Sequence, residues 1–477
     1  MTPETTVEHP RFATWLGVAL LGASVLSMWL PALHTPFWGD DYVYIHAAHA
    51  ANASSAPWWS DFWPTDLHPF WRPLSQEGYW RLVDTLLGDD AFATHTVSLL
   101  LHLLASGGVA LLALAISRAC RWQASRATAA LAGVAYAGLG MHMLPVHWAA
   151  AINNSLLTLF TTLCLAAWVH AADAAGRRRI LLLASVLPAL ALALLSKESA
   201  ALTVALMVVV RLFTGQSQAR KGELATLLGC IGLTAVWLVL HARFTTHLDS
   251  AYGLALGTNL IRNSVAFTAW LSDVPREALR MAVTGPRPRA IAWIAATALP
   301  MLAAFVMAFR HGRPSMRTRQ WLSVGLFAVV AYGPYFLLSW NSYAYYAAVA
   351  AILPTIALAH GAIGNPRMPI ILALLAISSW TAVEGTRQLD HPGLIGRAHW
   401  AERMLQGLEH RHVGHPLWVD VRDSHRFYAV GAAGLAWRLK IPEGDIHVAT
   451  QCPASASPCL RIDDDGNWRL DTGGKHH

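Results

Sequence analysis

The sequence is poor in charge and in nucleotide-binding or metal-binding motifs. Only 13% of its 477 residues are charged, about half of the ~25% that is usual in soluble domains. The net charge of +7 is not gathered into a dense basic run, so it does not indicate a nucleic-acid partner. The sequence shows no P-loop, GxSxG element, metal-spaced Cys/His cluster or internal repeat. These absences argue against an ATP-driven pump.

Cysteine is also scarce, because five residues are too few for a disulfide framework. Cys120, Cys164 and Cys230 fall in or beside apolar runs, and we expect them to be inert packing residues. Cys452 and Cys459 are the one pair that lies close in sequence. A disulfide between them is possible only if the C-terminal tail lies in an oxidising compartment.

Apolar residues dominate the chain, at 55% of the composition and a mean hydropathy of +0.39. A membrane-spanning helix needs ~20 mostly apolar residues, and the sequence therefore predicts an all-α, multi-pass membrane protein with about 11 spans. The first segment lacks a small-residue cleavage site, so we interpret it as a retained helix rather than a signal peptide. The candidates are residues 14–33, 95–117, 127–145, 148–170, 180–195, 199–213, 223–243, 289–309, 321–339, 343–362 and 368–384.

Lysine and arginine alternate between the loops that join these segments. The turns at residues 141–147 and 339–343 carry neither, whereas every second loop is basic. Cytoplasmic loops are enriched in lysine and arginine, so we expect a cytoplasmic N-terminus and an external C-terminal tail. The alanine- and arginine-rich style suggests a bacterial inner membrane. The basic loops contain Arg118, Arg121 and Arg126; Arg177, Arg178 and Arg179; Arg211, Arg220 and Lys221; Arg310, Arg313, Arg317 and Arg319; and Arg367.

Two long segments, residues 34–94 and 244–288, fall on the external side of this arrangement. The first is rich in tryptophan, and such rings favour the membrane–water interface or stack on sugars. The second contains an amphipathic helix around residues 259–281, which could lie along the lipid surface or simply connect two spans. The tryptophans of the first segment include Trp58, Trp59, Trp63 and Trp71.

The composition changes to that of a soluble protein at about residue 385. We therefore divide the chain into a membrane domain, residues 1–384, and a small extracytoplasmic α/β domain, residues 385–477. In the second domain, Trp400, Met404, Leu405 and Leu408 form one face of a helix. The short strands that we expect there are residues 417–421, 445–450, 459–463 and 467–471.

Polar residues that interrupt or end apolar segments are functional candidates, because a charge at the bilayer centre costs at least ~2.5–3.5 kcal/mol. Four such groups fall on the predicted external side. They are Asp40 with Asp41; His68 and Arg72 with Gln76 and Glu77; His142 and His147 with Asn153 and Asn154; and Ser196, Lys197 and Glu198, with Tyr343, Tyr345 and Tyr346 near the same face.

Each group also has a purely structural explanation. Lys197 and Glu198 could form a local ion pair that closes a helical hairpin. His147 could be a helix-end histidine bonded to backbone, and Arg72 could anchor to lipid headgroups. We favour chemistry because acids, cations and histidines converge on one side. An enzyme acting on a phosphate-linked substrate needs a base for the nucleophile and cations for the departing phosphate, and arginine and lysine both suit phosphate.

The order of these motifs resembles that of membrane glycosyltransferases of the GT-C fold. An acidic pair, RPL, HMLPVHWAAAINNSLL, LLSKESA and SYAYYAAVAAILP follow one another within residues 10–360. The resemblance is in particular to protein O-mannosyltransferases, above all those that carry tetratricopeptide repeats, and to their bacterial relatives. The chain departs from that pattern with Trp71 before Arg72, with LPVHW around His147, and in lacking a tetratricopeptide array.

The resemblance implies an inverting transfer of a sugar from a polyprenyl-phosphate donor to an acceptor hydroxyl, on a glycan or a protein, at the external membrane face. Asp40 would be the general base, with Asp41 positioning the acceptor or sharing that role. The donor phosphate would be bound by Arg72, Lys197 and His68. Glu198, which would orient Lys197, and His147, Tyr345 and Tyr346 would support the site.

The resemblance implies no required cofactor or metal, although an acidic pair could hold a divalent cation weakly. Two other classes of protein stay open. A transporter or flippase of a lipid-linked glycan would also have many helices, but such proteins usually show internal repeats and polar groups at the bilayer midplane. A non-catalytic membrane scaffold with a partner-binding tail is the third possibility.

Overall fold

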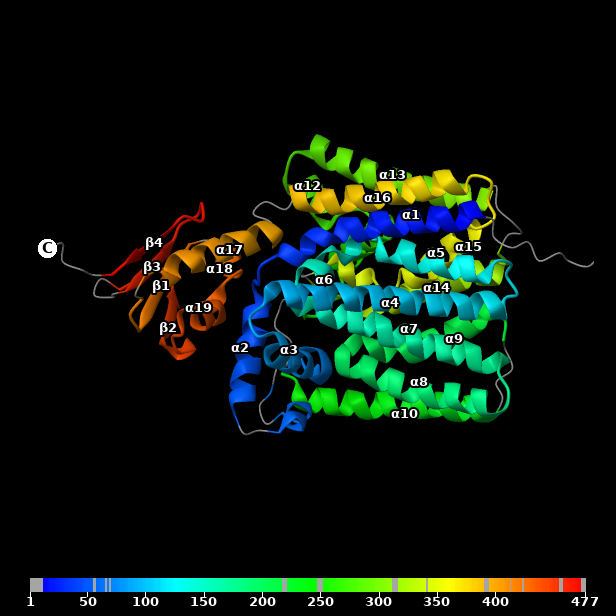
Figure 1. The fold of residues 1–477 in the computed structure, drawn as a ribbon, viewed down its shortest axis with the longest axis horizontal. Helices are drawn as coiled ribbons and strands as arrows, with labels where there is room; N and C mark the ends of the chain where they lie inside the picture. The colour runs from blue at the N-terminus through cyan, green and yellow to red at the C-terminus, as the bar shows by residue number, and fades with distance from the viewer. Residues whose placement is uncertain are drawn as a thin grey trace, which may run out of the picture.

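The protein is a bundle of long helices that carries a small α/β unit at one end (Figure 1). This is seen in a computed structural model. His68, one of the predicted phosphate-binding residues, lies outside the described part of the chain. The structure describes residues 12–54, 57–64, 67, 70–216, 221–246, 252–310, 316–339, 342–389, 394–411, 413–422, 424–453 and 458–472.

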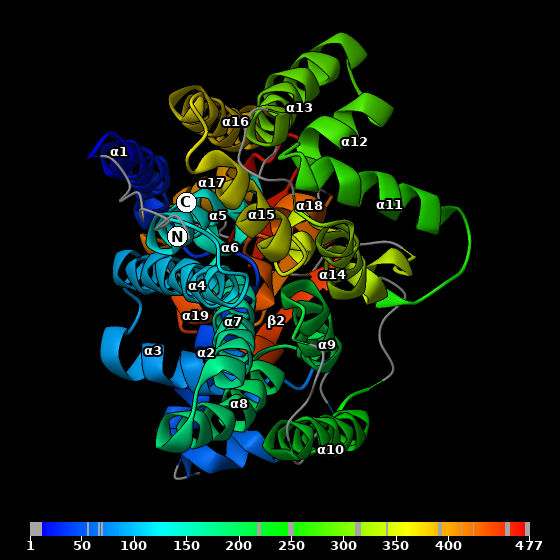
Figure 2. The ribbon, with the colours of Figure 1, turned by 90° about the vertical axis from the view of Figure 1, so that its right-hand side faces the viewer.

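Seven helices in the described ranges are long and apolar enough to cross a membrane, and a bent pair of helices makes a possible eighth. Eight of the eleven predicted segments coincide with them, which confirms the multi-pass, all-α class. Seen end-on, α8 and α10 lie on one side of the bundle and α13 and α16 on the other (Figure 2). The eight are α1 (Phe12–Trp29), α4 (Ala91–Ala119), α7 (Ile152–Asp173), α8 (Gly176–Ser196), α10 (Lys221–Phe244), α13 (Arg287–Arg310), α16 (Met368–Leu389), and the pair α5 (Ser125–Ala137) and α6 (Met143–His147).

The other three predicted segments coincide with α9 (Thr203–Thr214), α14 (Thr318–Phe336) and α15 (Ile352–Ala362). With 12 and 11 residues, α9 and α15 are only ~16–18 Å long at ~1.5 Å per residue, well short of the ~30 Å hydrocarbon core. Short 3-10 helices precede them: η6 (Glu198–Leu202) before α9 and η8 (Ala344–Ala347) before α15. The apolar run in the sequence therefore includes backbone that is not α-helical.

Basic residues from loops far apart in sequence meet at the end of the bundle where α1 begins. Arg211 and Arg179 both contact Glu223, whose side chain is buried, with N–O distances of 2.5 and 3.5 Å. At the same end, Trp122 stacks on His360 at a centroid distance of 3.7 Å. The α/β unit lies at the opposite end (Figure 1). The loops predicted to be cytoplasmic thus lie together, away from that unit.

The first predicted external segment folds as short helices beside the α/β unit: α2 (Asp40–Ala53), η2 (Trp58–Phe62), η3 (Pro73–Gly78, one π-helical turn) and α3 (Tyr79–Leu87) (Figure 1). Trp58, Trp59 and Trp63 are each more than half exposed, as interfacial rings would be. Trp71 is buried instead and stacks on Trp237 of α10. The tryptophans of this segment therefore divide into surface and core residues.

The single amphipathic helix that we expect around residues 259–281 is two helices, α11 (Thr258–Leu271) and α12 (Arg276–Thr284). Asp273 has a positive φ of 65°, and Pro275 cannot continue a preceding helix. The buried Asp273 carboxylate accepts hydrogen bonds from the Gly140 N–H and the Ser378 hydroxyl, at 2.6 and 3.2 Å. The break between the helices is therefore fixed by polar contacts with the bundle.

The C-terminal unit has a four-stranded sheet in the order β2-β1-β3-β4. The first three strands are parallel and β4 is antiparallel to β3, and each lies where the sequence predicts a strand. On α17, the side chains of Met404, Leu405 and Leu408 are fully buried, as the predicted helix face requires. The elements are α17 (Leu394–Glu409), β1 (Leu417–Val421), α18 (Ser424–Phe427), α19 (Gly431–Leu439), β2 (Ile446–Ala449), β3 (Cys459–Ile462) and β4 (Trp468–Asp471).

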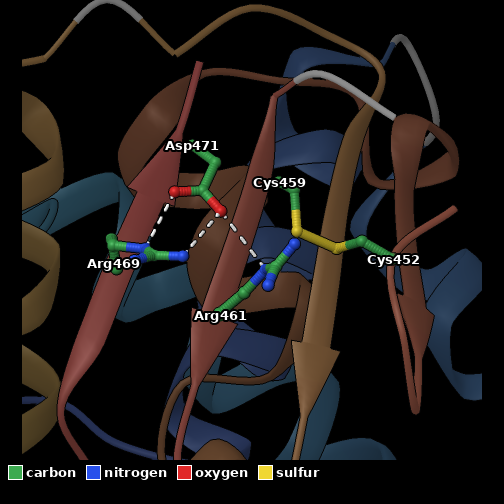
Figure 3. The surroundings of a disulfide bond; sticks show 5 residues. All are labelled: Cys452, Cys459, Arg461, Arg469 and Asp471. Atoms are coloured by element: carbon green, nitrogen blue, oxygen red, sulfur yellow. Dashed lines mark hydrogen bonds and ion pairs between the residues drawn. A yellow bond between two sulfur atoms is a disulfide. The ribbon is translucent and has the colours of Figure 1, made fainter. Parts of the chain in front are cut away.

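A disulfide joins Cys452 to Cys459 at the start of β3 (Figure 3). On the same sheet, Arg461 and Arg469 both pair with Asp471, at 3.2 and 2.9 Å (Figure 3). The other three cysteines are free and are buried or partly buried, as expected of packing residues. The disulfide fits the prediction that this unit lies in an oxidising compartment.

The loop charges predict which side of the membrane the α/β unit faces. We expect alkaline phosphatase fused to the C-terminus to be active, and green fluorescent protein fused there to be dark, because the tail would lie outside. The same reporters fused after Arg310, at the basic end, should give the reverse pattern. Reporter activity measured in intact cells tests this, and a fluorescent C-terminal fusion would contradict the orientation.

Candidate active site

The acidic pair begins α2, directly after the chain leaves the bundle. Gly39 precedes the helix with a positive φ of 59°, a conformation that glycine adopts without strain. Asp40 and Asp41 occupy the first turn, where the helix dipole favours negative charge. The turn that places the pair is therefore built into the local sequence.

Asp41 is fully buried and anchors α2 to the bundle. Its Oδ2 accepts a hydrogen bond from the Trp38 N–H at 3.1 Å, and its Oδ1 accepts one from the Ala150 N–H at 2.6 Å. Burial raises the pKa of the Asp41 carboxyl well above its usual value, although these two N–H groups act in the opposite direction. Since both oxygens are bonded to backbone, the contacts favour a positioning role over the acceptor-facing role that we expected.

Asp40 is only partly buried and points away from the bundle toward the α/β unit. Its Oδ1 accepts a hydrogen bond from the Tyr428 hydroxyl at 2.8 Å. Burial raises the pKa of Asp40, while this hydrogen bond and the positive charge of Arg72 lower it. Asp40 is thus the member of the pair that can meet a substrate.

Arg72 forms a bidentate ion pair with Glu198, 126 residues away. Its Nε and Nη2 donate to the two carboxylate oxygens at 2.7 and 2.6 Å, and its guanidinium lies 4.1 Å from the centre of the Phe70 ring. Burial by itself raises the pKa of Glu198, but the charges of Arg72 and Lys197 lower it to about 2. Glu198 therefore orients Arg72, and not Lys197 as the sequence suggested.

Lys197 is buried among aromatic rings, with 2% of its surface exposed. Its Nζ donates to Asn154 Oδ1 at 2.5 Å and lies 4.9 and 5.2 Å from the centres of the Tyr346 and Tyr345 rings. Burial, and then the charge of Arg72, lower the pKa of Lys197 to about 7. Lys197 and Glu198 therefore do not form the local ion pair that could have closed a helical hairpin. Lys197 contacts Asn154 and the tyrosine rings instead.

The segment after Arg72 connects α2 to the end of α8. Ser75 donates its hydroxyl to the Ser196 carbonyl at 2.7 Å, and Gln76 Nε2 donates to the Tyr44 hydroxyl at 2.6 Å. These residues form the π-helical turn η3, and such turns occur frequently at functional sites. Beside them, burial raises the pKa of Glu77 to about 7. The RPLSQE segment, residues 72–77, therefore links α2, through Tyr44, to the end of α8, next to Lys197.

These contacts bring the predicted cations and Asp40 to the same end of the bundle, but not into one open cavity. Arg72 interacts electrostatically with both Asp40 and Lys197. A small cavity of about 10 Å³ lies next to the partners of Lys197, between α7, α9 and α14, and Asp40 and Arg72 do not line it. Its polar lining includes Asn154, Ser199, Tyr335, Tyr345 and Tyr346.

His147 lies beneath the start of α2, away from the cations. It is buried, and its Nδ1 is 3.0 Å from the Thr35 hydroxyl. Its carbonyl accepts a hydrogen bond from the Trp38 indole at 3.4 Å. These contacts support the loop that carries the acidic pair, so the geometry favours a structural role for this histidine.

Three tyrosines that the sequence did not single out surround Asp40 and Arg72. Tyr428 bonds to Asp40, and Tyr44 interacts electrostatically with Asp40 and Arg72. Tyr252 also interacts electrostatically with Asp40 and Arg72, and its ring packs on that of Phe70 at a centroid distance of 5.1 Å. Their positions in the sequence carry no motif that points to a site.

The described residues contain no group of three or more His, Cys, Asp or Glu side chains that could hold a metal ion. The acidic pair does not present a shared chelating edge, because Asp41 is bonded to backbone and Asp40 to Tyr428. The charged groups of the candidate site are the Asp40 carboxylate, the Arg72 guanidinium and the Lys197 amino group.

No protein-family model and no curated protein matches the chain. Two crystal structures of ArnT from Cupriavidus metallidurans are similar to it. The one bound to undecaprenyl phosphate has a TM-score of 0.53 at 15% identity, over 95% of this chain and 94% of that chain. The apo structure has a TM-score of 0.54 at 15% identity, over 92% and 87%. The fold is thus shared along nearly the whole chain, which confirms the predicted GT-C-like architecture.

A cryo-EM structure of the mycobacterial arabinofuranosyltransferase AftD is less similar, with a TM-score of 0.46 at 16% identity, over 87% of this chain and 30% of that chain. The finer resemblance to O-mannosyltransferases stays a prediction, because likeness at this level of identity shows the fold alone.

The Arg72–Glu198 pair makes a stability prediction. Removing one partner of a fully buried ion pair costs ~3–5 kcal/mol, and Glu198→Gln should cost less because a third of the Glu198 side chain is exposed. We expect a lower unfolding temperature in detergent, and partial recovery in the charge-swapped double variant Arg72→Glu/Glu198→Arg. Arg469→Gln removes an exposed ion pair and should change little. Equal effects of Glu198→Gln and Arg469→Gln would contradict the prediction.

Proposed function

We propose that the protein is a glycosyltransferase that moves a sugar, with inversion, from a polyprenyl-phosphate donor to an acceptor hydroxyl on a glycan or a protein. The observation that carries the proposal is the convergence of Asp40, Arg72 and Lys197 at the end of the bundle that bears the α/β unit. The loop charges assign that end to the external face. The shared fold with ArnT, solved with undecaprenyl phosphate, supports this class of donor.

Asp40 is the proposed general base. It would take the proton from the acceptor hydroxyl while the acceptor oxygen forms a bond to the anomeric carbon of the sugar. The bond between that carbon and the phosphate oxygen breaks on the opposite side, and polyprenyl phosphate leaves with the bonding electrons. Such proton transfer contributes typically ~10²–10⁴-fold to rate. Burial raises the pKa of Asp40, and the Tyr428 hydroxyl and the charge of Arg72 act in the opposite direction, in favour of the carboxylate.

Lys197 and Arg72 are the proposed ligands of the donor phosphate. Arg72 uses two of its five N–H donors on Glu198, so others remain for phosphate oxygens. Burial lowers the pKa of Lys197 to about 7, so its amino group is easily deprotonated. An arriving phosphate would supply the missing negative charge, so the lysine would gain a proton and stabilise the leaving group.

The position of these groups separates the enzyme from the two alternatives. A transporter or flippase usually has internal repeats and polar groups at the midplane of the bilayer. Here the cations lie at helix ends: Lys197 directly follows α8, and Arg72 directly precedes η3. A non-catalytic scaffold would not require Arg72 to interact with both Asp40 and Lys197, nor a buried lysine among tyrosine rings. Membrane lipids would surround the remaining helices.

Replacing Asp40 and Asp41 by asparagine, one at a time, should separate a catalytic role from a structural one. We expect Asp40→Asn to unfold at the wild-type temperature and to lose at least ~10²-fold in transfer, because only the base is removed. Asp41→Asn replaces one carboxylate oxygen by an N–H donor that faces a backbone N–H, so it should lose ~1–3 kcal/mol of stability. Transfer from a polyprenyl-phosphate sugar and thermal unfolding are measured together. Wild-type transfer by Asp40→Asn would exclude it as the base.

The lowered pKa of Lys197 predicts proton uptake when the donor phosphate binds. At pH 8 a lysine with a pKa of about 7 is mostly neutral, so binding of undecaprenyl phosphate should take up a proton. Calorimetry in two buffers of different ionisation enthalpy measures this uptake. Lys197→Arg stays charged and should bind with less uptake. Equal uptake in the variant and the wild-type protein would place the phosphate elsewhere.

A further inference from the structure

The loop after β1 of the C-terminal unit is bonded directly to the start of α2. The Gly39 N–H donates to the Ala429 carbonyl at 2.8 Å, beside the bond from the Tyr428 hydroxyl to Asp40 Oδ1 at 2.8 Å. A Cβ atom on Gly39 would lie 3.2 Å from Tyr428 Cε1, which is closer than most real contacts. The glycine before the acidic pair therefore also allows the tyrosine to approach.

Further contacts hold α2 along α19. Tyr42 packs so closely on Gly434 that a Cβ atom there would lie 2.9 Å from the Tyr42 ring. The His49 ring lies 5.2 Å from that of Trp437, and His46 Nδ1 is 3.5 Å from Glu443. The helix that carries Asp40 is thus held between the bundle, through Asp41, and the C-terminal unit.

The topology of the sheet explains why this loop carries a functional side chain. In open α/β sheets, ligands bind beyond the carboxyl ends of the parallel strands, and Tyr428 follows the carboxyl end of β1. The loop after β3 supports this position, because the Arg422 N–H donates to the Ile462 carbonyl and Arg426 Nη1 donates to the Asp464 carbonyl, at 3.2 and 3.1 Å. The carboxyl edge of the sheet therefore meets Asp40.

We infer that Tyr428 is a positioning residue of the active site: its hydroxyl holds Oδ1 of Asp40 and leaves Oδ2 to receive the acceptor proton. The inference rests on the proposed function and extends it, because it places the acceptor between α2 and the loop after β1. In the described part of the chain, Tyr428 is the one side chain that donates a hydrogen bond to Asp40. The bond fixes the direction of the carboxylate, as a base requires.

The electrostatic surroundings of Asp40 give the inference a pH signature. The Tyr428 hydroxyl and the charge of Arg72 lower the pKa of Asp40. The other titratable groups that interact with Asp40 are Asp41, Tyr44 and Tyr252. The charge of Asp40, with the partial burial of the phenol, raises the pKa of Tyr428, so the hydroxyl stays a donor. Removing it takes away one stabiliser of the carboxylate and must raise the pKa of Asp40.

The test compares Tyr428→Phe with Glu443→Gln in the full-length protein. Tyr428→Phe should move the acid limb of the kcat/KM pH profile to higher pH, with a loss of up to roughly tenfold in kcat/KM along that limb and recovery as the pH rises. Glu443→Gln removes a contact of the same unit with α2 but leaves the bond to Asp40, so its pH profile should match the wild type. Both variants are checked for wild-type expression and monodispersity.

A second readout does not depend on the substrate. In a thermal-unfolding cycle of Tyr428→Phe, Asp40→Ala and the double variant, the two single shifts should not add, because each substitution alone removes the same hydrogen bond. Additive shifts, or an unchanged pH profile in an active Tyr428→Phe protein, would overturn the inference and leave the proposed function intact. Higher activity of Tyr428→Phe at every pH would also overturn it, by making the tyrosine a blocking group. If the shifts are non-additive but the wild-type protein transfers no sugar from any polyprenyl-phosphate donor, the proposed function is overturned instead.

Discussion

The bidentate ion pair between Arg72 and Glu198 is the constraint on which the site depends. It joins the segment between α1 and α4 to the break between α8 and α9, two places that no apolar periodicity brings together. A planar guanidinium and a carboxylate satisfy each other in one geometry only, so the pair fixes both distance and direction. Because both oxygens of Glu198 are bonded to Arg72, the Lys197 amino group donates to Asn154 instead and lies among the tyrosine rings.

The two neighbouring acids differ in role because their surroundings differ. Asp41 is enclosed by backbone N–H groups of the bundle, whereas Asp40 meets a side chain of the C-terminal unit. The first contact fixes where α2 begins, and the second fixes the direction of the partly buried Asp40 carboxylate. This carboxylate stays partly accessible while α2 is held on both sides, since α19 lies along the same helix.

The sequence predicted the membrane class, the four strands and the candidate polar groups, because each leaves a local trace in hydropathy or spacing. It left the disulfide between Cys452 and Cys459 open. It did not predict which groups pair. Lys197 is in extended backbone, at φ −162° and ψ 142°, so its side chain and that of Glu198 point to opposite sides and cannot form the expected pair. Tyr428 lies 388 residues from Asp40, and hydropathy cannot report such a contact. It also cannot distinguish 3-10 turns from the short helices α9 and α15 that follow them.

Breaks in the helices, rather than long loops alone, set the depth of the site. The α8–α9 segment breaks at η6, the α14–α15 segment at η8, and the α5–α7 segment at α6. Irregular backbone at membrane depth is tolerated where it is buried in protein or lines a cavity, and these breaks supply Lys197, the tyrosines and Asn154. Burying a cation is costly, and burial accordingly lowers the pKa of Lys197 to about 7. Under the proposed function, a phosphate beside Lys197 would offset that cost.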